Sequence, residues 1–159
     1  MRILDNSLLT RLEFQFLPII TQLEGKGRID ISKRPGNDKW SIAENIAHLG
    51  RYQEIFVKRV DQILAHENPE FDRYNANEDV DFRPWLDKSM PALRSDIEKD
   101  RKVIFTKITS LANDELVRRG RHPKLGWLDI VDWVEFFLLH EAHHLYTIFW
   151  LEHEHKRED

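Results

Sequence analysis

Apolar residues recur every three or four positions over four long stretches of the chain, which is the spacing of amphipathic helices. Ser41 and Glu44 form a capping box that predicts the start of the second helix. Asp129, with Asp132 three residues later, predicts an N-terminal cap for the last helix. Pro18 predicts a kink in the first helix. The predicted helices cover about residues 7–23, 41–65, 84–111 and 129–151.

No stretch alternates apolar and polar residues convincingly, and no internal repeat is present. The sequence therefore predicts an all-α fold, a four-helix bundle with long connecting loops, one of which covers 120–127. A chain of 159 residues fits one domain, assigned to residues 1–159, with residues 152–159 as a frayed tail. The charged run over 96–102 is expected to form a solvated face of the third helix.

Composition excludes several classes of function. The chain has 24 Lys plus Arg against 28 Asp plus Glu, a net charge of −4, so a nucleic-acid partner is not expected. It has no cysteine, hence no disulfide and no thiol nucleophile of its own, which suits a reducing cytoplasm. Residues 1–6 lack the apolar run of a signal peptide, and no later stretch is long and apolar enough to span a membrane. We therefore expect a cytoplasmic protein.

The last predicted helix carries two histidines on its apolar face. His140 and His144 lie within the apolar arc, whereas His143 points well away from it. Imidazoles four residues apart stack one turn apart and can meet a single metal ion. The alternative is a pair of core histidines satisfied by hydrogen bonds. His48, at the edge of the apolar stripe of the second helix, is the candidate for a third metal ligand.

Three segments resemble the DinB-like family of metal-binding four-helix bundles: WSIAENIAHL at 40–49, HPKLGW at 122–127 and HEAHHL at 140–145. The resemblance covers nearly the whole chain. It implies one histidine ligand on the second helix and an H-x-x-x-H pair on the fourth, which correspond to His48, His140 and His144. It also implies a divalent ion such as zinc or nickel, an open coordination position and frequent homodimers. Thiol-dependent branches, such as bacillithiol transferases and mycothiol-dependent isomerases, make a low-molecular-weight thiol a candidate cofactor.

Two functional hypotheses follow from these features. The first is a DinB-like divalent-metal-binding protein, a metal-dependent thiol S-transferase or hydrolase acting on a small-molecule substrate. The second is a non-catalytic metal- or ligand-binding dimeric bundle in a stress response. An enzyme should keep a pocket beside the metal, whereas a structural protein should seal the histidines in packing. The last helix also carries apolar residues outside the arc of its histidines, which predicts a homodimer built on that helix: Phe136, Phe149 and Trp150.

The segment His140–His144 also reads H-E-x-x-H, the zinc-and-base motif of metalloproteases. The longer form of that motif needs Gly and His where Thr147 and Trp150 stand, so an H-E-x-x-H zinc hydrolase is a minor alternative. Glu141 is a candidate base or a support for the metal ligands. It could equally be a buried, salt-bridged carboxylate or one at a dimer interface.

Other histidine chemistry is not expected. A di-iron centre needs Glu-x-x-His on two helices, whereas this sequence has that pattern on the last helix alone. His122 lies in a proline-containing connection and His66 in a polar one, so we expect both at the surface and neither as a metal ligand.

Overall fold

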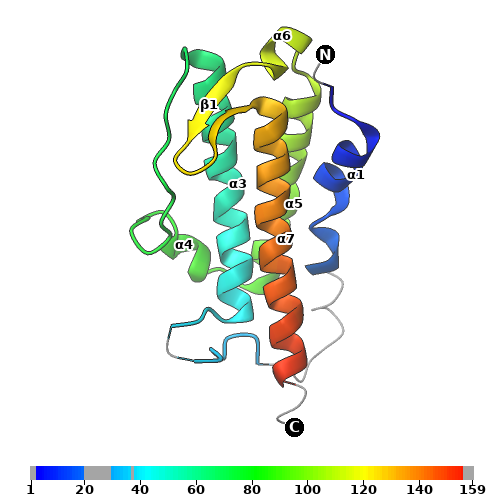
Figure 1. Ribbon diagram of the computed structural model, residues 1–159. Coiled ribbons are helices and arrows are strands. Elements are labelled where there is room, and N and C mark those ends of the chain that lie inside the picture. Colours follow the sequence, from blue (N-terminus) through cyan, green and yellow to red (C-terminus); the bar gives the residue numbers. More distant parts are fainter. Residues whose placement is uncertain (1–2, 20–29, 37, 156–159) are drawn as a thin grey trace.

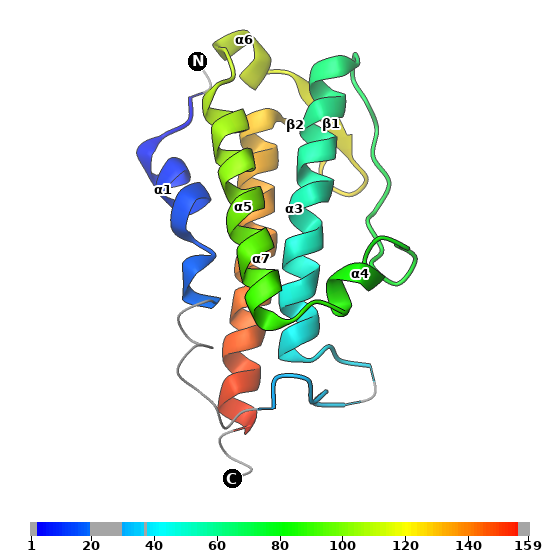
Figure 2. The same cartoon turned by 180° about the vertical axis from the view of Figure 1, so that it is seen from behind.

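The structure is a computed structural model that describes residues 3–19, 30–36 and 38–155. Helix α3 packs against α5 and α7, and α1 contacts the same two helices from the other side (Figures 1 and 2). This arrangement confirms the predicted bundle. Its four helices are α1 (Asn6–Phe14), α3 (Ile42–Ala65), α5 (Met90–Thr109) and α7 (Ile130–His155).

The helices of the bundle do not simply alternate in direction along the chain. Helices α3 and α5 run the same way, because the crossover segment between them, residues 66–89, returns along the side of α3 (Figure 1). The crossover holds the short helix α4 (Arg83–Leu86), and α6 (Asn113–Leu116) follows α5. Helix α7 then runs back antiparallel to α3. Of the long connections, it is the crossover over 66–89 that carries the chain from one end of the bundle to the other.

A small antiparallel hairpin, β1 (Arg119–His122) and β2 (Gly126–Asp129), stands where the sequence predicted only a loop. Strands of four residues are too short to show an alternating pattern, so periodicity missed them. Gly126 has φ +78°, a left-handed conformation that suits glycine at the hairpin turn. The hairpin is tied to the crossover, because Arg121 N–H donates to the Pro69 carbonyl and Phe71 N–H donates to the Arg121 carbonyl.

Local capping explains where the two site-bearing helices start. At the start of α3, Glu44 N–H donates to Ser41 Oγ at 3.2 Å, and Ser41 N–H donates to Glu44 Oε2 at 2.8 Å. At the start of α7, Asp132 N–H donates to Asp129 Oδ1 at 2.9 Å. Both predicted caps are confirmed, and they fix the helical phase of the histidines that follow.

Three predicted boundaries differ from the structure. The first predicted helix is interrupted next to Pro18, where the sequence predicted a kink: α1 ends at Phe14, a turn covers 15–16, and residues 17–19 are helical again. The interruption arises because Pro18 has no N–H to donate to the Phe14 carbonyl. The predicted stretch 20–23 lies outside the described residues. The third predicted helix is divided into α4 and α5, with Pro91 in the first turn of α5. The frayed tail is wrong over 152–155, where α7 continues and Glu152 is buried, and 156–159 lie outside the described residues.

The charged run 96–102 is also not wholly solvated, because Arg101 within it is buried between helices. An ion pair with Glu141 on α7 makes that burial possible. Among the described residues, no helix combines the length and apolar character needed to cross a lipid bilayer.

Candidate metal centre

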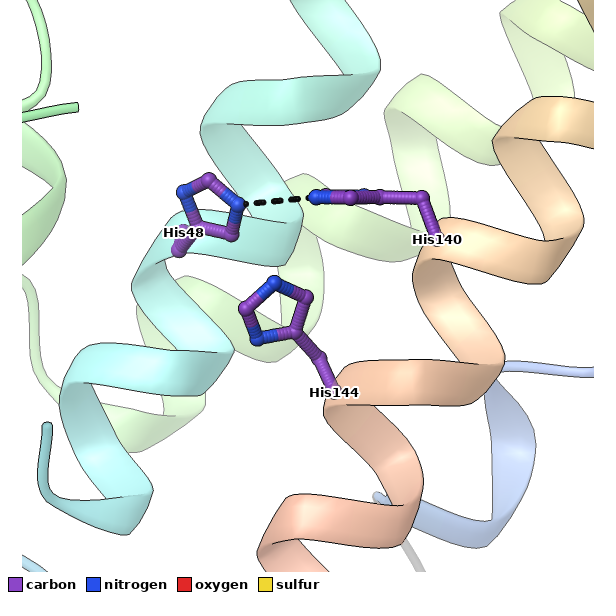
Figure 3. Close-up of side chains that lie close together, drawn as sticks. All are labelled: His48, His140 and His144. Carbon is purple, nitrogen blue, oxygen red and sulfur yellow. Dashed lines mark hydrogen bonds between the residues drawn. The ribbon is translucent and has the colours of Figure 1, made fainter. Parts of the chain in front are cut away.

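Three histidines predicted as ligands come together between α3 and α7 (Figure 3). His48 comes from α3, while His140 and His144 project from consecutive turns of α7. One ring nitrogen from each lies within 4.8 Å of the others, and we call this cluster the histidine triad. His143 is exposed and outside the triad, as the angular argument predicted.

The spacing of two of the ring nitrogens suits a divalent ion. His48 Nε2 and His140 Nε2 are 3.2 Å apart. Two nitrogens at a zinc–nitrogen distance of about 2.0–2.1 Å are separated by about 2.9 Å for right-angle ligands and about 3.4 Å for tetrahedral ones. The Nδ1 atoms of both rings are buried and have no hydrogen-bond partner among the described residues, so no protein group prevents the Nε2 lone pairs from facing an ion. The donor set therefore fits a metal with at least one open position.

Asn45 orients the third imidazole. Its Nδ2 donates to the Ser41 carbonyl at 2.8 Å, which turns Oδ1 toward His144. Oδ1 lies 2.8 Å from His144 Nδ1 and accepts its proton, so the lone pair of that ring is on Nε2. Asn45 was not among the site residues predicted from the sequence. Its position three residues before His48, on the same face of α3, was the available signal.

Burial keeps the triad neutral. It lowers the pKa of His48 to about 3, that of His140 to about 2 and that of His144 to about 4, and charge on neighbouring histidines lowers these pKa values further. At neutral pH all three rings are therefore unprotonated. This is the form in which imidazole binds a metal ion.

The triad lines a pocket of about 430 Å³ between α3, α7, the crossover and the hairpin. We call it the triad pocket. The three rings are thus not sealed in packing, which is the condition set above for an enzyme. Four aromatic side chains also line the pocket and make much of its wall apolar: Trp40, Tyr52, Tyr74 and Phe136.

An arginine that the sequence analysis missed lies one side chain from the triad. The Tyr52 ring packs on His140 with ring centroids 3.9 Å apart, and the Tyr52 hydroxyl accepts from Arg59 Nη1 at 3.2 Å. Burial raises the pKa of Tyr52, so its hydroxyl stays protonated. Arg59 stands eleven residues after His48, a spacing that returns to the same helix face, so the signal was present in the sequence.

Glu141 lies outside the triad pocket. Its Oε2 is paired with Arg101 of α5, and its Oε1 accepts from Gln15 Nε2 at 3.1 Å. Of the roles left open by the sequence, the structure therefore gives it that of a buried, salt-bridged carboxylate. A hydrolase of the H-E-x-x-H type needs the glutamate beside the ion, where it acts as the base. Glu141 does not lie there, so this alternative lacks its catalytic base.

His122 differs from its predicted surface position. It is half-buried in β1 against Trp133 and Phe136 and lines the triad pocket. Its Nδ1 accepts from the backbone N–H groups of Lys124 and Leu125, at 3.2 and 3.1 Å, which shapes the hairpin turn. Burial, followed by the charge of Arg59, lowers its pKa. His66, the other histidine expected at the surface, caps the C-terminal end of α3 and is exposed as predicted.

Comparison with known families identifies the chain. Residues 30–148, which include the whole triad, match the DinB superfamily. The chain belongs to the DinB superfamily. This confirms the family and the four-helix fold that the motifs at 40–49 and 140–145 indicated.

Solved structures with the same fold are distant in sequence. YfiT from Bacillus subtilis, described as a probable metal-dependent hydrolase with an unusual four-helix bundle topology, is 14% identical at a TM-score of 0.78, covering 94% of this chain and 86% of YfiT. An uncharacterized protein from Clostridium difficile 630 is 16% identical at a TM-score of 0.64, covering 95% of this chain and 98% of that protein. Comparison with curated protein sequences finds no match.

Proposed function

We propose that this DinB-superfamily protein is a divalent-metal-dependent enzyme that hydrolyses, or transfers a thiol to, a small molecule bound in the triad pocket. The observation that carries the proposal is the convergence of three neutral imidazoles at the wall of a pocket of about 430 Å³. The fold shared with YfiT, described as a probable metal-dependent hydrolase, supports the same class of chemistry.

Different residues bind the ion, orient one of its ligands and contact the substrate. His48, His140 and His144 hold the ion through Nε2, and Asn45 keeps the third ring in the ligating tautomer. A zinc or nickel ion suits three imidazoles, and when bound it supplies Lewis-acid activation of an oxygen or sulfur nucleophile. The aromatic wall receives the apolar part of the substrate. Since the chain has no cysteine, a sulfur nucleophile has to come from a small thiol.

Metal content tests the first half of this proposal. Protein purified without chelators and without a metal-affinity tag should carry about one zinc or nickel ion per chain, and added zinc should raise the Tm of the metal-free protein. His140→Ala should weaken zinc binding by orders of magnitude, because two remaining imidazoles hold a divalent ion poorly. The matched control is His143→Ala, one turn away and exposed, which should bind zinc like the parent protein. Equal loss of affinity in both variants would contradict the assignment.

Enzymatic turnover tests the second half of the proposal, the catalytic activity. Zinc- or nickel-loaded protein should cleave activated esters or amides, or couple a small thiol to an electrophile, and His140→Ala should abolish the activity. One metal ion per chain without turnover in either assay would favour the alternative, a non-catalytic metal-binding bundle.

We also infer that α7 forms a homodimer interface. Of the three residues on which the sequence based this interface, Phe149 and Trp150 are exposed, whereas Phe136 is half-buried and lines the triad pocket. Leu139 and Tyr146 are exposed on the same face of α7 as Phe149 and Trp150. Light scattering should give twice the mass of the chain, and Tyr146→Glu should yield a folded monomer. A monomeric parent protein would rule out this interface.

A further inference from the structure

We propose that the small molecule held in the triad pocket carries an anionic group, a carboxylate or a phosphate, which Arg59 binds with help from Lys124. The inference deepens the proposed function by naming the substrate class. Recognition of the anion by these side chains does not itself require the metal, and the two proposals can therefore fail separately.

The charge of the pocket wall is the first observation. Arg59, Arg73 and Lys124 line the triad pocket, and no carboxylate does so among the described residues. The chain as a whole has 28 acidic residues against 24 basic ones. A wall with three cations and no counter-ion is thus opposite in sign to the rest of the molecule, and it attracts small anions.

The partners of Arg59 are the second observation. Three of the arginines that the structure describes are buried: Arg51, Arg59 and Arg101. Arg51 pairs with the carboxylates of α3 and the crossover, and Arg101 pairs with Glu141. Arg59 is only 8% exposed, yet no carboxylate pairs with it among the described residues. A desolvated charge without a counter-ion is costly, so an anion from solution has a site prepared for it.

The position of the Arg59 guanidinium is fixed without being neutralised. It donates to the Tyr52 hydroxyl at 3.2 Å and to the Asp72 backbone carbonyl at 3.0 Å. It also lies 5.6 and 5.4 Å from the ring centroids of Phe71 and Trp133. These neutral contacts use two of its five N–H donors and leave the others for a ligand. A guanidinium whose position is fixed, and which still has N–H donors available, is suited to bidentate binding of a carboxylate or phosphate.

The placement of Arg59, one side chain away from the triad, fits a small substrate. Tyr52 separates Arg59 from His140, touching the first through its hydroxyl and the second through its ring. An anionic group at Arg59 would place the adjoining part of the same molecule beside the triad. Lys124 and Arg73 are exposed at the mouth of the pocket, where they would draw the anion inward. The aromatic wall then accepts an apolar or aromatic body.

Probes of matched shape test the inference on metal-free protein, where an anion cannot bind to zinc. Phenylacetate, phenyl phosphate and neutral phenylacetamide are titrated into the protein, and binding is followed by backbone amide chemical shifts. We expect both anions to bind at least about tenfold more tightly than the amide, the size of one charge-assisted hydrogen bond. A preference between the two anions identifies the group as carboxylate or phosphate.

Charge-neutralising variants locate the effect. Arg59→Gln and Lys124→Gln should each weaken phenylacetate or phenyl phosphate binding, by about tenfold for the buried arginine and less for the exposed lysine. The control is Lys58→Gln, which removes the same charge from an exposed position of α3 outside the triad pocket and should leave binding unchanged. If Arg59→Gln does not fold, Lys124→Gln and Arg73→Gln at exposed positions still decide the question.

Three results would overturn the inference: equal binding of phenylacetamide and the anions, no binding of either anion, or equal weakening by Lys58→Gln and Lys124→Gln. Zinc titration of the same parent protein separates this outcome from failure of the proposed function. Zinc binding without anion binding refutes only the substrate class. Anion binding without zinc binding refutes only the metal centre.

Discussion

Replacing Glu141 by Gln removes one charge from an ion pair that is almost completely withdrawn from water. The side chains of Arg101 and Glu141 are 2% and 3% exposed. In the variant, Arg101 would keep its bonds to Gln53 Oε1 at 2.9 Å and to the Leu12 carbonyl at 3.0 Å, but these acceptors are neutral. The guanidinium would then be a buried charge with no counter-ion, which is unfavourable in a low-dielectric interior.

The expected cost of Glu141→Gln follows from this burial. Breaking a buried ion pair from one side destabilises a protein by about 3–5 kcal/mol. For a chain of this length, a Tm shift of roughly 2–4 °C per kcal/mol gives a fall of roughly 6–20 °C. Urea denaturation followed by circular dichroism measures the free energy directly. Zinc affinity should not change, because the carboxylate lies outside the triad pocket.

Glu135→Gln is the matched control on the same helix. Glu135 accepts from Arg11 through both carboxylate oxygens, at 2.8 and 2.6 Å, but the two side chains are 41% and 36% exposed. Its loss should cost less than about 1 kcal/mol. The double variant Arg101→Leu/Glu141→Leu should recover much of the stability lost by Glu141→Gln, since it buries no unpaired charge. Equal costs for Glu135→Gln and Glu141→Gln would refute the desolvation argument.

Three further predictions concern the site and its support. Metal-free protein should lose stability as the pH falls below about 6.5, because the pKa values of the triad in the folded protein lie at about 2 to 4 and the unfolded chain binds more protons. The slope of the unfolding free energy against pH approaches about 1.4 kcal/mol per pH unit for each histidine. Urea denaturation at a series of pH values measures this slope. A flat profile from pH 6.5 to pH 4 would contradict it. Asn45→Ala frees the His144 ring to change tautomer and should weaken zinc binding about 10–100-fold by calorimetry, whereas unchanged affinity would deny the orienting role. Gly50→Ala places a methyl group against the Trp85 ring and should cost about 1–3 kcal/mol in thermal denaturation, and an unchanged Tm would contradict this close packing.

Local physics explains how much of the site could be predicted from the sequence. Side-chain directions repeat every 3.6 residues in a helix, so the sequence alone placed His140 and His144 on one face and His143 on another. The caps at Ser41 and Asp129 fixed the starts of α3 and α7, because a cap depends on backbone groups only three residues away. The three histidines could therefore be predicted as candidate metal ligands on two helices. The resemblance to a known family then implied that all three bind the same ion.

Contacts between distant segments were decided only by the tertiary structure. Arg101 looked like part of a solvated charged run, and only the packing of α5 and α7 against α1 and α3 placed it beside Glu141. The hairpin was missed because its strands are stabilised by pairing with each other and with the crossover, not by a local pattern. Arg59 lies on the histidine face of α3, yet whether it meets a carboxylate depends on which segments fold over it, and none pairs with it among residues 3–19, 30–36 and 38–155. Helical periodicity acts over one or two turns, whereas burial and charge pairing are set by residues that meet in space after being far apart in the chain.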